Sequence, residues 1–341
     1  MSLDIADRIR RHGFKRLLLA VSGGLDSICL AHYFIKNREA LGIEWLGIAH
    51  VHHGLRVGTA DRDAAFVEAF ARKYNIPFFL KRLNGEALKN AEGSLEENAR
   101  DARYKALQEA AENCDAIVTA HHAGDQAETM YMRLRRGTTL AGLKGIQEVR
   151  DNIYRPFLNV TRAELLTYAR ENNLEWCEDE SNSDVKFARN KVRHEFFPQL
   201  EKESPGAATQ LCRIALLADK AYAKVMNAGE SLFAPVLRAV NADADIHQHD
   251  MWAGIALDKK KLRKVLLAHE STDLSEMFRL WLSEQGFRFP IGFFYSQTEP
   301  AHVKIPVRAA YRKRSIVKKG STVLICEFES VEAALKFVSC K

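Results

Sequence analysis

Short runs of hydrophobic residues alternate with segments of helical periodicity through the first half of the chain. The runs are too short to be helices of their own and are bounded by turn residues, which is typical of strands buried on both faces. Between them, hydrophobic residues recur three or four positions apart, which predicts helices. We therefore expect strands at residues 17–21, 45–51, 77–83 and 115–120, and helices at residues 25–35, 60–74, 94–110 and 124–135.

Strands that alternate with helices at this spacing predict an α/β fold with a doubly wound, mainly parallel sheet. Ligands bind such sheets at the carboxyl ends of the strands. Polar segments follow three of the expected strands, at residues 22–27, 50–56 and 121–128. We expect these three segments to meet at one edge of the sheet.

The first of these segments, SGGLDS (Ser22, Gly23, Gly24, Leu25, Asp26 and Ser27), has the composition of a phosphate-binding turn. Glycines allow close approach of a ligand, and the first amides of a helix have no acceptor within that helix. Glycine and serine are also common in ordinary strand–helix turns. Asp26 favours the binding site, because a carboxylate there either holds Mg²⁺ that the phosphates share or caps the helix. The lysine of a Walker A motif is absent.

Two acidic residues of the third segment, Asp125 and Glu128, are three positions apart on an expected helix and therefore share a face. Together with Asp26 they can surround Mg²⁺ and an incoming ammonium group. Solvated acids on a surface helix are the simpler alternative. The nearby histidines also allow a zinc site, but their spacing matches no common zinc pattern.

The second half of the chain predicts helices and a smaller lobe. Thr161 and Glu164 form a capping box, and an acidic stretch at residues 178–184 adjoins a basic one at residues 187–193. These two stretches form either a loop that orders over phosphates or an interhelical loop with local ion pairs. We expect a catalytic domain at residues 1–200, a helical connector at 201–245 with its helix at 204–229, and a small basic α+β lobe at 246–341 with a strand at 322–328.

Composition and charge narrow the class of protein. The 341 residues are 47% hydrophobic, but no apolar run approaches the roughly 18 residues of a membrane span. The N-terminal residues lack a secretory pattern, so we expect a cytoplasmic protein without membrane contact. The six cysteines include no CxxC pair, which argues against a disulfide framework or a zinc ribbon. The net charge is +6, and residues 301–320 hold seven Lys or Arg and no acid, which indicates a solvated basic face or a surface for a polyanion.

Seven motifs carry a resemblance to a known family. The loop SGGLDS resembles the pyrophosphate loop of the N-type ATP pyrophosphatases, also called the PP-loop family. The set resembles the tRNA(Ile)-lysidine synthases more specifically, although Thr139 stands where that family usually has glycine. In chain order over residues 17–200, the motifs are SGGLDS, HVHHGLR, EENARDARY, TAHHAGDQAET, RRGTTLAGLKGI, YRPFL and EDESNSDVKFARNKVR.

The resemblance implies an adenine nucleotide alpha hydrolase-like PP-loop domain and an ATP-dependent ligase. Members of the family join free L-lysine to C2 of the wobble cytidine in the CAU-anticodon tRNA(Ile), through an O2-adenylated intermediate, and release pyrophosphate and AMP. ATP and Mg²⁺ are the implied cofactors, with Ser22 to Ser27 on ATP and Asp26 on the metal. The implied catalytic residues are Asp26, His50, Asp125 and Glu128, and the implied substrate or tRNA contacts are Arg100, Arg103, His121, His122, Arg189 and Arg193. We add Arg312, Lys313 and Arg314 of the basic lobe as expected tRNA contacts.

Three alternatives remain at this stage. Another PP-loop tRNA-modifying adenylase, such as a cytidine thiolase, shares the loop chemistry but usually needs a CxxC pair. A nitrogen-transferring synthetase for a small molecule is disfavoured by the basic lobe. An RNA-binding protein without activity is disfavoured by the intact acids at 26, 125 and 128. A homodimer is compatible with the sequence.

Overall fold

The computed structural model describes residues 5–54, 59–178, 192–234, 237–238, 254–258, 274–284, 308–311, 314–319 and 322–327. The chain divides into two compact units. The first consists of Met1–Thr138 and Gly142–Leu216, and the second of Thr139–Ala141 and Leu217–Lys341. The domains expected at residues 1–200, 201–245 and 246–341 remain predictions.

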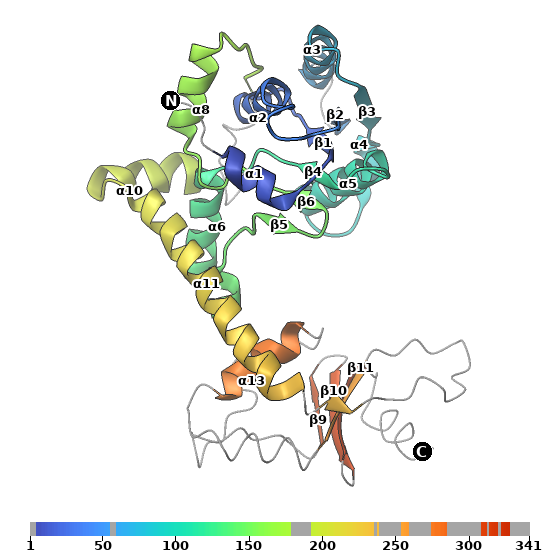
Figure 1. Cartoon of the computed structure of the whole chain (residues 1–341), viewed down its shortest axis with the longest axis vertical. Helices are drawn as coiled ribbons and strands as arrows, with labels where there is room; N and C mark the ends of the chain where they lie inside the picture. The colour runs from blue at the N-terminus through green and yellow to red at the C-terminus, as the bar shows by residue number, and fades with distance from the viewer. Residues whose placement is uncertain are drawn as a thin grey trace, which may run out of the picture. The chain divides into compact units, whose positions relative to one another are not determined.

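A six-stranded sheet forms the centre of the first unit, in the order β3-β2-β1-β4-β6-β5 (Figure 1). Neighbouring strands are parallel except β5, which pairs antiparallel with β6. The predicted doubly wound, mainly parallel sheet is therefore confirmed. The strands are β1 (Arg16–Ala20), β2 (Trp45–His52), β3 (Phe78–Arg82), β4 (Ala116–Val118), β5 (Val149–Arg150) and β6 (Ile153–Tyr154).

Helices follow most of these strands, close to where the periodicity predicts them. The side chain of Ser94 caps one of them by accepting a hydrogen bond from the N–H of Glu97, and Thr161 and Glu164 form a complete capping box at another. The helices of the first unit, with those that continue beyond it, are α1 (Ala6–His12), α2 (Leu25–Lys36), α3 (Thr59–Lys73), α4 (Gly85–Asn90), α5 (Leu95–Ala110), α6 (Ala123–Arg136), α7 (Leu140–Leu143), α8 (Arg162–Glu171), the π-helical turn η2 (Val192–Phe196), α10 (Phe197–Glu203) and α11 (Ala207–Phe233).

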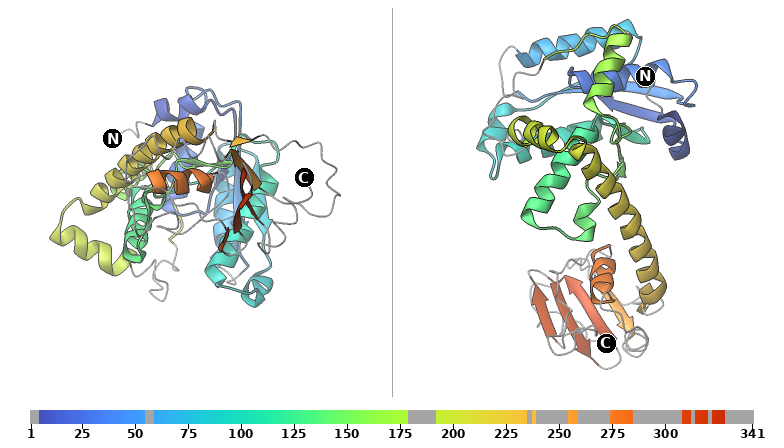
Figure 2. Two further views of the ribbon diagram at one scale, coloured as in Figure 1. Left: turned by 90° about the horizontal axis from the view of Figure 1, so that it is seen from below. Right: turned by 90° about the vertical axis from the view of Figure 1, so that its left-hand side faces the viewer.

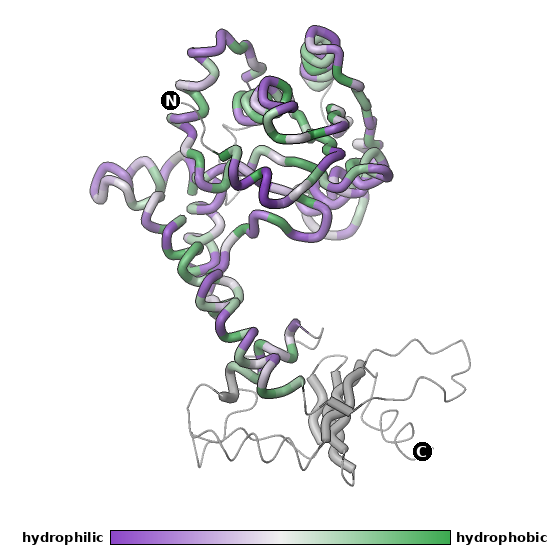
Figure 3. Tube along the Cα trace, in the orientation of Figure 1, coloured by the Kyte–Doolittle hydropathy of each residue, from purple (hydrophilic) through white to green (hydrophobic). Residues whose placement is uncertain are grey.

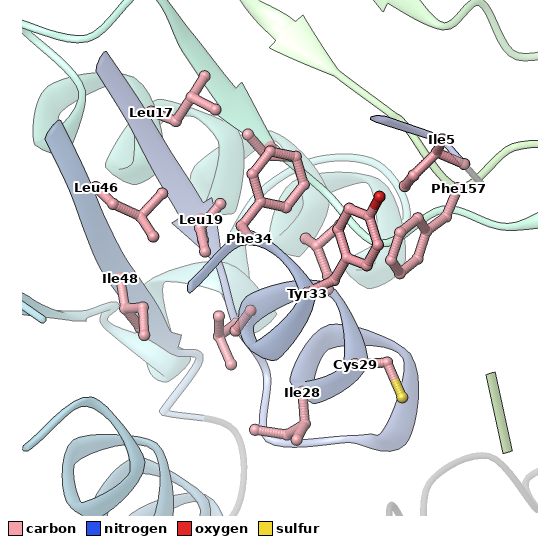
Figure 4. Packing of buried hydrophobic residues seen from close by; sticks show 14 of the residues in the cluster. Ile5, Leu17, Leu19, Ile28, Cys29, Tyr33, Phe34, Leu46, Ile48 and Phe157 are labelled. Carbon is pink, nitrogen blue, oxygen red and sulfur yellow. The ribbon is translucent and has the colours of Figure 1, made fainter. Parts of the chain in front are cut away.

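Successive residues of β1 point to opposite faces of the sheet, and each face has its own hydrophobic core. Leu17 and Leu19 join a large cluster with residues of α2, α3 and α8, part of which is drawn in Figure 4. Leu18 faces the other way and packs with Leu107 of α5 and with Ala49 and Ile117 of the neighbouring strands. Each fully buried leucine contributes about 1.5–3 kcal/mol relative to an exposed one. Because both faces are covered, the sheet leaves its carboxyl edge as the place for ligands.

The second unit contains a five-stranded antiparallel sheet in the order β7-β8-β11-β10-β9, visible in orange and red in Figure 2. The end of α11, whose hydrophobic and hydrophilic residues alternate in Figure 3, packs against α13 (Leu274–Glu284). Phe233 meets Phe278 with ring centroids 4.9 Å apart, and Trp281 donates a hydrogen bond to Glu230 (2.8 Å). The expected α+β lobe is thus present, with strands β7 (Leu237–Arg238), β8 (Gly254–Asp258), β9 (Arg308–Tyr311), β10 (Arg314–Lys319) and β11 (Thr322–Glu327).

Candidate active site

The loop between β1 and α2 is shaped by its own residues. Gly23 has a φ of 100°, in the region that favours glycine because it has no Cβ. The hydroxyl of Ser27 accepts hydrogen bonds from the N–H groups of Ser22 and Gly23, both at 3.2 Å, and donates to the carbonyl of Gly24 at 2.9 Å. Ser27, expected as an ATP contact, is buried and holds the loop together, while the first amides of α2 have no acceptor within the helix.

Asp26 lies in the first turn of α2, beside this loop. Its Oδ1 atom is buried and has no hydrogen-bond partner among the described residues, and its Oδ2 atom lies 3.7 Å from Nε2 of His122. Burial raises the pKa of Asp26, and the neighbouring His122 and Arg162 partly oppose that rise. A carboxylate with one unsatisfied oxygen next to a phosphate-binding loop is chemically suited to Mg²⁺, which prefers such oxygen ligands.

His122 connects Asp26 to the acids of α6. Its ring Nδ1 accepts a hydrogen bond from the N–H of Gly124 (2.9 Å), so in the neutral ring the hydrogen is assigned to Nε2. That nitrogen lies 3.7 Å from Asp26 and 3.8 Å from Asp125. Asp125 in turn accepts from the backbone N–H of His122 (3.0 Å), which completes a capping box at the start of α6.

Glu128 and Asp125 share the guanidinium group of Arg193. Glu128 accepts from Nε at 2.5 Å and from Nη2 at 3.1 Å, and Asp125 accepts from Nη2 at 3.0 Å. Glu128 is only 3% exposed. Burial lowers the pKa of Arg193, but the hydrogen bond and charge of Glu128 outweigh that effect and raise it. The two acids therefore face the same way, as their spacing predicts, and hold one cation between them.

Aromatic stacking fixes the segment that carries Arg193. The rings of Tyr131 and Phe196 stack with centroids 4.0 Å apart. Tyr131 is three residues after Glu128, and Phe196 is three residues after Arg193. One turn of α6 and the π-helical turn η2 are thus joined by an ionic pair and an aromatic pair. π-helical turns often occur at functional sites.

Of the other residues expected at the site, His50 lies near the carboxyl end of β2 and His121 follows β4. His50 is buried and donates from Nδ1 to the carbonyl of Val21 (2.8 Å), and burial lowers its pKa despite that hydrogen bond. His121 is hydrogen-bonded to the hydroxyl of Thr119. Arg100 and Arg103 lie on α5, away from the three acids in sequence. Arg189, Arg312 and Lys313 lie outside the described residues, and Arg314 begins β10, where only the backbone is described.

Two contributions to the site were not anticipated from the sequence. The backbone N–H of Cys177 donates to the carbonyl of Gly23 at 2.9 Å, so the segment after α8 supports the loop. The charge of Arg162, at the start of α8, lowers the pKa of Asp26. Both depend on contacts between residues more than 130 positions apart, and no local pattern signals them.

No group of three or more His, Cys, Asp or Glu residues in the described part of the chain is arranged to hold a metal ion. The thiols at residues 29, 114, 177 and 212 are free. None of the described helices combines the length and hydropathy that a membrane span requires.

Curated relatives support the resemblance seen in the sequence. A tRNA(Ile)-lysidine synthase from Geobacter sulfurreducens is 42% identical over 210 residues, which are 60% of this chain and 44% of the relative. Another, from Pseudomonas fluorescens, is 38% identical over 223 residues, covering 63% of this chain and 49% of the relative. A third, from Haemophilus ducreyi, is 33% identical over 286 residues and covers 82% and 60%. The chain thus spans about half the length of the curated relatives it matches.

Among solved structures, the U34-tRNA thiolase NcsA from Methanococcus maripaludis has the same fold. The two superpose with a TM-score of 0.50 at 19% identity, over 63% of this chain and 78% of the thiolase. The PP-loop domain family matches residues 2–200, more than half of the 341 residues. This match covers the sheet, the SGGLDS loop and the acids of α6, and the chain belongs to the PP-loop domain family.

Proposed function

We propose that the protein is a tRNA(Ile)-lysidine synthase, an ATP-dependent ligase that forms a carbon–nitrogen bond. Its substrates are ATP, free L-lysine and the CAU-anticodon tRNA(Ile), and its products are the lysidine-containing tRNA, AMP and pyrophosphate. The curated relatives support this assignment over the matched region.

The observation that carries the proposal is the position of the acids beside the loop. Asp26 follows β1, Asp125 and Glu128 follow β4, and these strands are neighbours in the sheet. His122 lies between Asp26 and Asp125, within 4 Å of both. A phosphate-binding turn is therefore adjacent to a pair of carboxylates that binds a cation, which suits a reaction between a nucleotide and an amine.

The first half of the reaction is activation of the cytosine. The loop amides and the start of α2 hold the departing phosphates by hydrogen bonds and the helix dipole. Cytosine O2 attacks the α-phosphorus of ATP, the bond to the β-phosphate oxygen breaks, and pyrophosphate leaves. Asp26 would hold Mg²⁺, which would supply neutralisation of the phosphate charge.

The second half is attack of the lysine ε-amine on C2, with loss of AMP. The amine must first bind as an ammonium and then lose a proton, and we assign both roles to Glu128 or Asp125. These acids bind the guanidinium of Arg193 in the structure. Arg193 therefore occupies the position that we propose for the ammonium group of lysine. Lysine can bind there only if Arg193 releases at least one of the two acids.

A cytidine thiolase is the main competing function, because the fold is shared with a tRNA thiolase. Sulfur transfer usually depends on a CxxC pair, and the sequence has none. The pKa values of Cys29, Cys114, Cys177 and Cys212 are all raised by burial, so the described thiols are poor nucleophiles. This favours an amine as the second nucleophile.

The deciding experiment is incubation with ATP, labelled lysine and two transcripts, tRNA(Ile) and tRNA(Met), which share the CAU anticodon. We expect label in the tRNA(Ile) and stoichiometric AMP release. Omission of ATP and the variant Asp26→Ala are the controls. Label in neither transcript, under conditions where ATP is cleaved, would exclude the ligase.

A further inference from the structure

The glycine-bearing motif RRGTTLAGLKGI, residues 135–146, begins in the last turn of α6 and has no part in the site described above. Its end is held by a side chain from the start of the same helix. The carboxamide of Gln126 accepts a hydrogen bond from the N–H of Ile146 (2.6 Å) and donates one to the carbonyl of Ile146 (3.0 Å). Gln126 is buried, so these two hydrogen bonds are shielded from water. One side chain thus satisfies both backbone groups of a loop residue, as a neighbouring strand does in a sheet.

Arg133, two turns further along α6, holds the same segment. Its Nη1 atom donates to the carbonyls of Gly142 (2.5 Å) and Gly145 (3.0 Å). Residues seven positions apart lie on the same side of a helix, because seven residues are close to two full turns. Gln126 and Arg133 therefore form a row on α6 that binds the backbone of residues 142–146, which we call the glycine segment.

The glycine segment fits closely against Gln126. Gly145 is buried and has a φ of 65°, in the region that favours glycine. A Cβ atom at this position would clash with the carboxamide oxygen of Gln126. The glycine at 145 is thus required by the contact with α6 as well as by the backbone conformation.

Asp125 and Glu128 lie on a different side of α6 from this row. At about 100° per residue, the midpoint of the two acids is roughly 120° around the helix from that of Gln126 and Arg133. Arg193 binds the acids on their side, and the glycine segment binds the helix on the other. These two sets of polar contacts together fix the rotation of α6 about its axis.

A small rotation of α6 is enough to displace the acids. Side chains extend about 5–6 Å from the axis of a helix, so a rotation of about 10° moves a carboxylate by about 1 Å. A misplacement of that size can lower a rate by on the order of 100-fold, even when the mutated residue does not touch the substrate. Lysine binding requires Arg193 to release at least one acid. After that release, the hydrogen bonds to the glycine segment remain to hold the helix.

We propose that Gln126 is a positioning residue for the lysine-dependent step, because its hydrogen bonds to the glycine segment set the positions of Asp125 and Glu128. The proposal rests on the proposed function, in which these acids bind the ammonium group of lysine and take its proton. The SGGLDS loop and Asp26 belong to other elements, since they follow β1 and begin α2. Loss of the contact at Gln126 should therefore affect the use of lysine and largely spare the use of ATP.

Rapid-quench measurement of pyrophosphate release and lysine incorporation by the full chain tests this role. In Gln126→Met the side chain keeps its length but loses both hydrogen bonds. We expect lysine incorporation to slow by about 10–100-fold and the KM for lysine to rise. The KM for ATP and the rate of pyrophosphate release should stay near those of wild type. Gln108→Met is the matched control and should change none of these quantities, because Gln108 is an exposed glutamine of α5.

Gly145→Ala changes the other partner of the same contact. Its methyl group displaces the carboxamide of Gln126, so this variant should show the same loss of lysine incorporation. In the double variant with Gln126→Met the two losses should not add, because each single change already removes the contact. Fully additive losses would assign the two residues to separate roles and contradict the proposal.

Equal slowing of both steps, with an unchanged KM for lysine, would mean that Gln126 is merely structural and would overturn the positioning role. Lysine incorporation at the wild-type rate in folded Gln126→Met would overturn it as well. If that variant does not fold, Arg133→Gln decides in its place, because Arg133 is partly exposed and also binds the glycine segment. The same selective loss of lysine incorporation is expected there, and wild-type kinetics would refute it.

Lysine incorporation by the wild-type chain is scored first. Absence of label in wild type would refute the ligase assignment and the positioning role together. Label in wild type, with unimpaired lysine incorporation in the variants, would refute the positioning role alone.

Discussion

The pair formed by Glu128 and Arg193 gives a sharp prediction about stability and catalysis. Glu128→Gln keeps the shape of the side chain but removes its charge. Loss of one partner of a buried ion pair costs about 3–5 kcal/mol. Arg193 is 28% exposed on its side chain and keeps Asp125 as a partner, which reduces the cost. We therefore expect the free energy of unfolding to fall by about 2 kcal/mol, the size of a charged hydrogen bond.

Urea denaturation of Glu128→Gln, Arg193→Met and the double variant measures this pair directly. Because each single change removes the same interaction, the double variant should be more stable than the sum of the two predicts, by about 1–2 kcal/mol. Glu68→Gln is the control, since its pair with Arg72 is exposed and contributes less than about 1 kcal/mol. Strictly additive losses at 128 and 193 would refute the reasoning.

The same variant tests the proposed chemistry. If Glu128 binds the ammonium and takes its proton, Glu128→Gln should slow lysine incorporation while pyrophosphate release continues. Rapid-quench measurement of both products separates the two steps. Lysidine formation at the wild-type rate would remove Glu128 from this role.

Three further predictions concern the loop, the metal and the basic lobe. Because burial raises the pKa of Asp26 in the folded protein, ionisation of this carboxyl opposes folding. The folded protein is stabilised by protonated Asp26 below the ordinary pKa of the group, and this stabilisation is lost as the pH rises through the raised pKa. Asp26→Asn should therefore have a higher melting temperature than wild type at pH 7 but not at pH 3, and a lower one at pH 7 would contradict the effect of burial. Mg²⁺ with ATP should no longer raise the melting temperature of this variant. Gly23→Ala should lower the free energy of unfolding by about 1–2 kcal/mol, because Gly23 has a φ of 100°. Gly24→Ala is the control and should fold normally, since Gly24 has a φ of −73° and a Cβ there would have its nearest contact at 3.7 Å. Equal denaturation midpoints for the two variants would argue against this difference. Neutralising residues 312–314 should flatten the salt dependence of tRNA binding by about 0.7–0.9 per lost phosphate contact, and an unchanged slope in filter binding would refute a tRNA contact there.

Local pattern predicted the scaffold well. The apolar runs located β1, β2, β3 and β4 to within two residues, because strands that are buried on both faces consist almost entirely of hydrophobic residues. Ser94 and Thr161 marked helix starts, since their side chains satisfy amides a few residues away. The spacing of Asp125 and Glu128 predicted a shared direction, which their common partner confirms.

Long-range contacts were beyond that reasoning. Arg193 meets Glu128 across 65 residues of chain, and the sequence alone assigned it to phosphates or a nucleotide. The strands β5 and β6 have two residues each, too few to show periodicity, so the position of Arg155 after a strand was not anticipated. His122 as a helix cap was also missed, because histidine is an uncommon residue at that position.

The hydrogen bonds around Ser27 have a consequence for how the loop meets its ligand. Its hydroxyl holds two amides and a carbonyl of the loop together. The backbone therefore loses little conformational entropy on binding, and more of the interaction energy appears as affinity. If the protein is the ligase that we propose, a preorganised turn should also favour rebinding of pyrophosphate, and inhibition by added pyrophosphate is then expected.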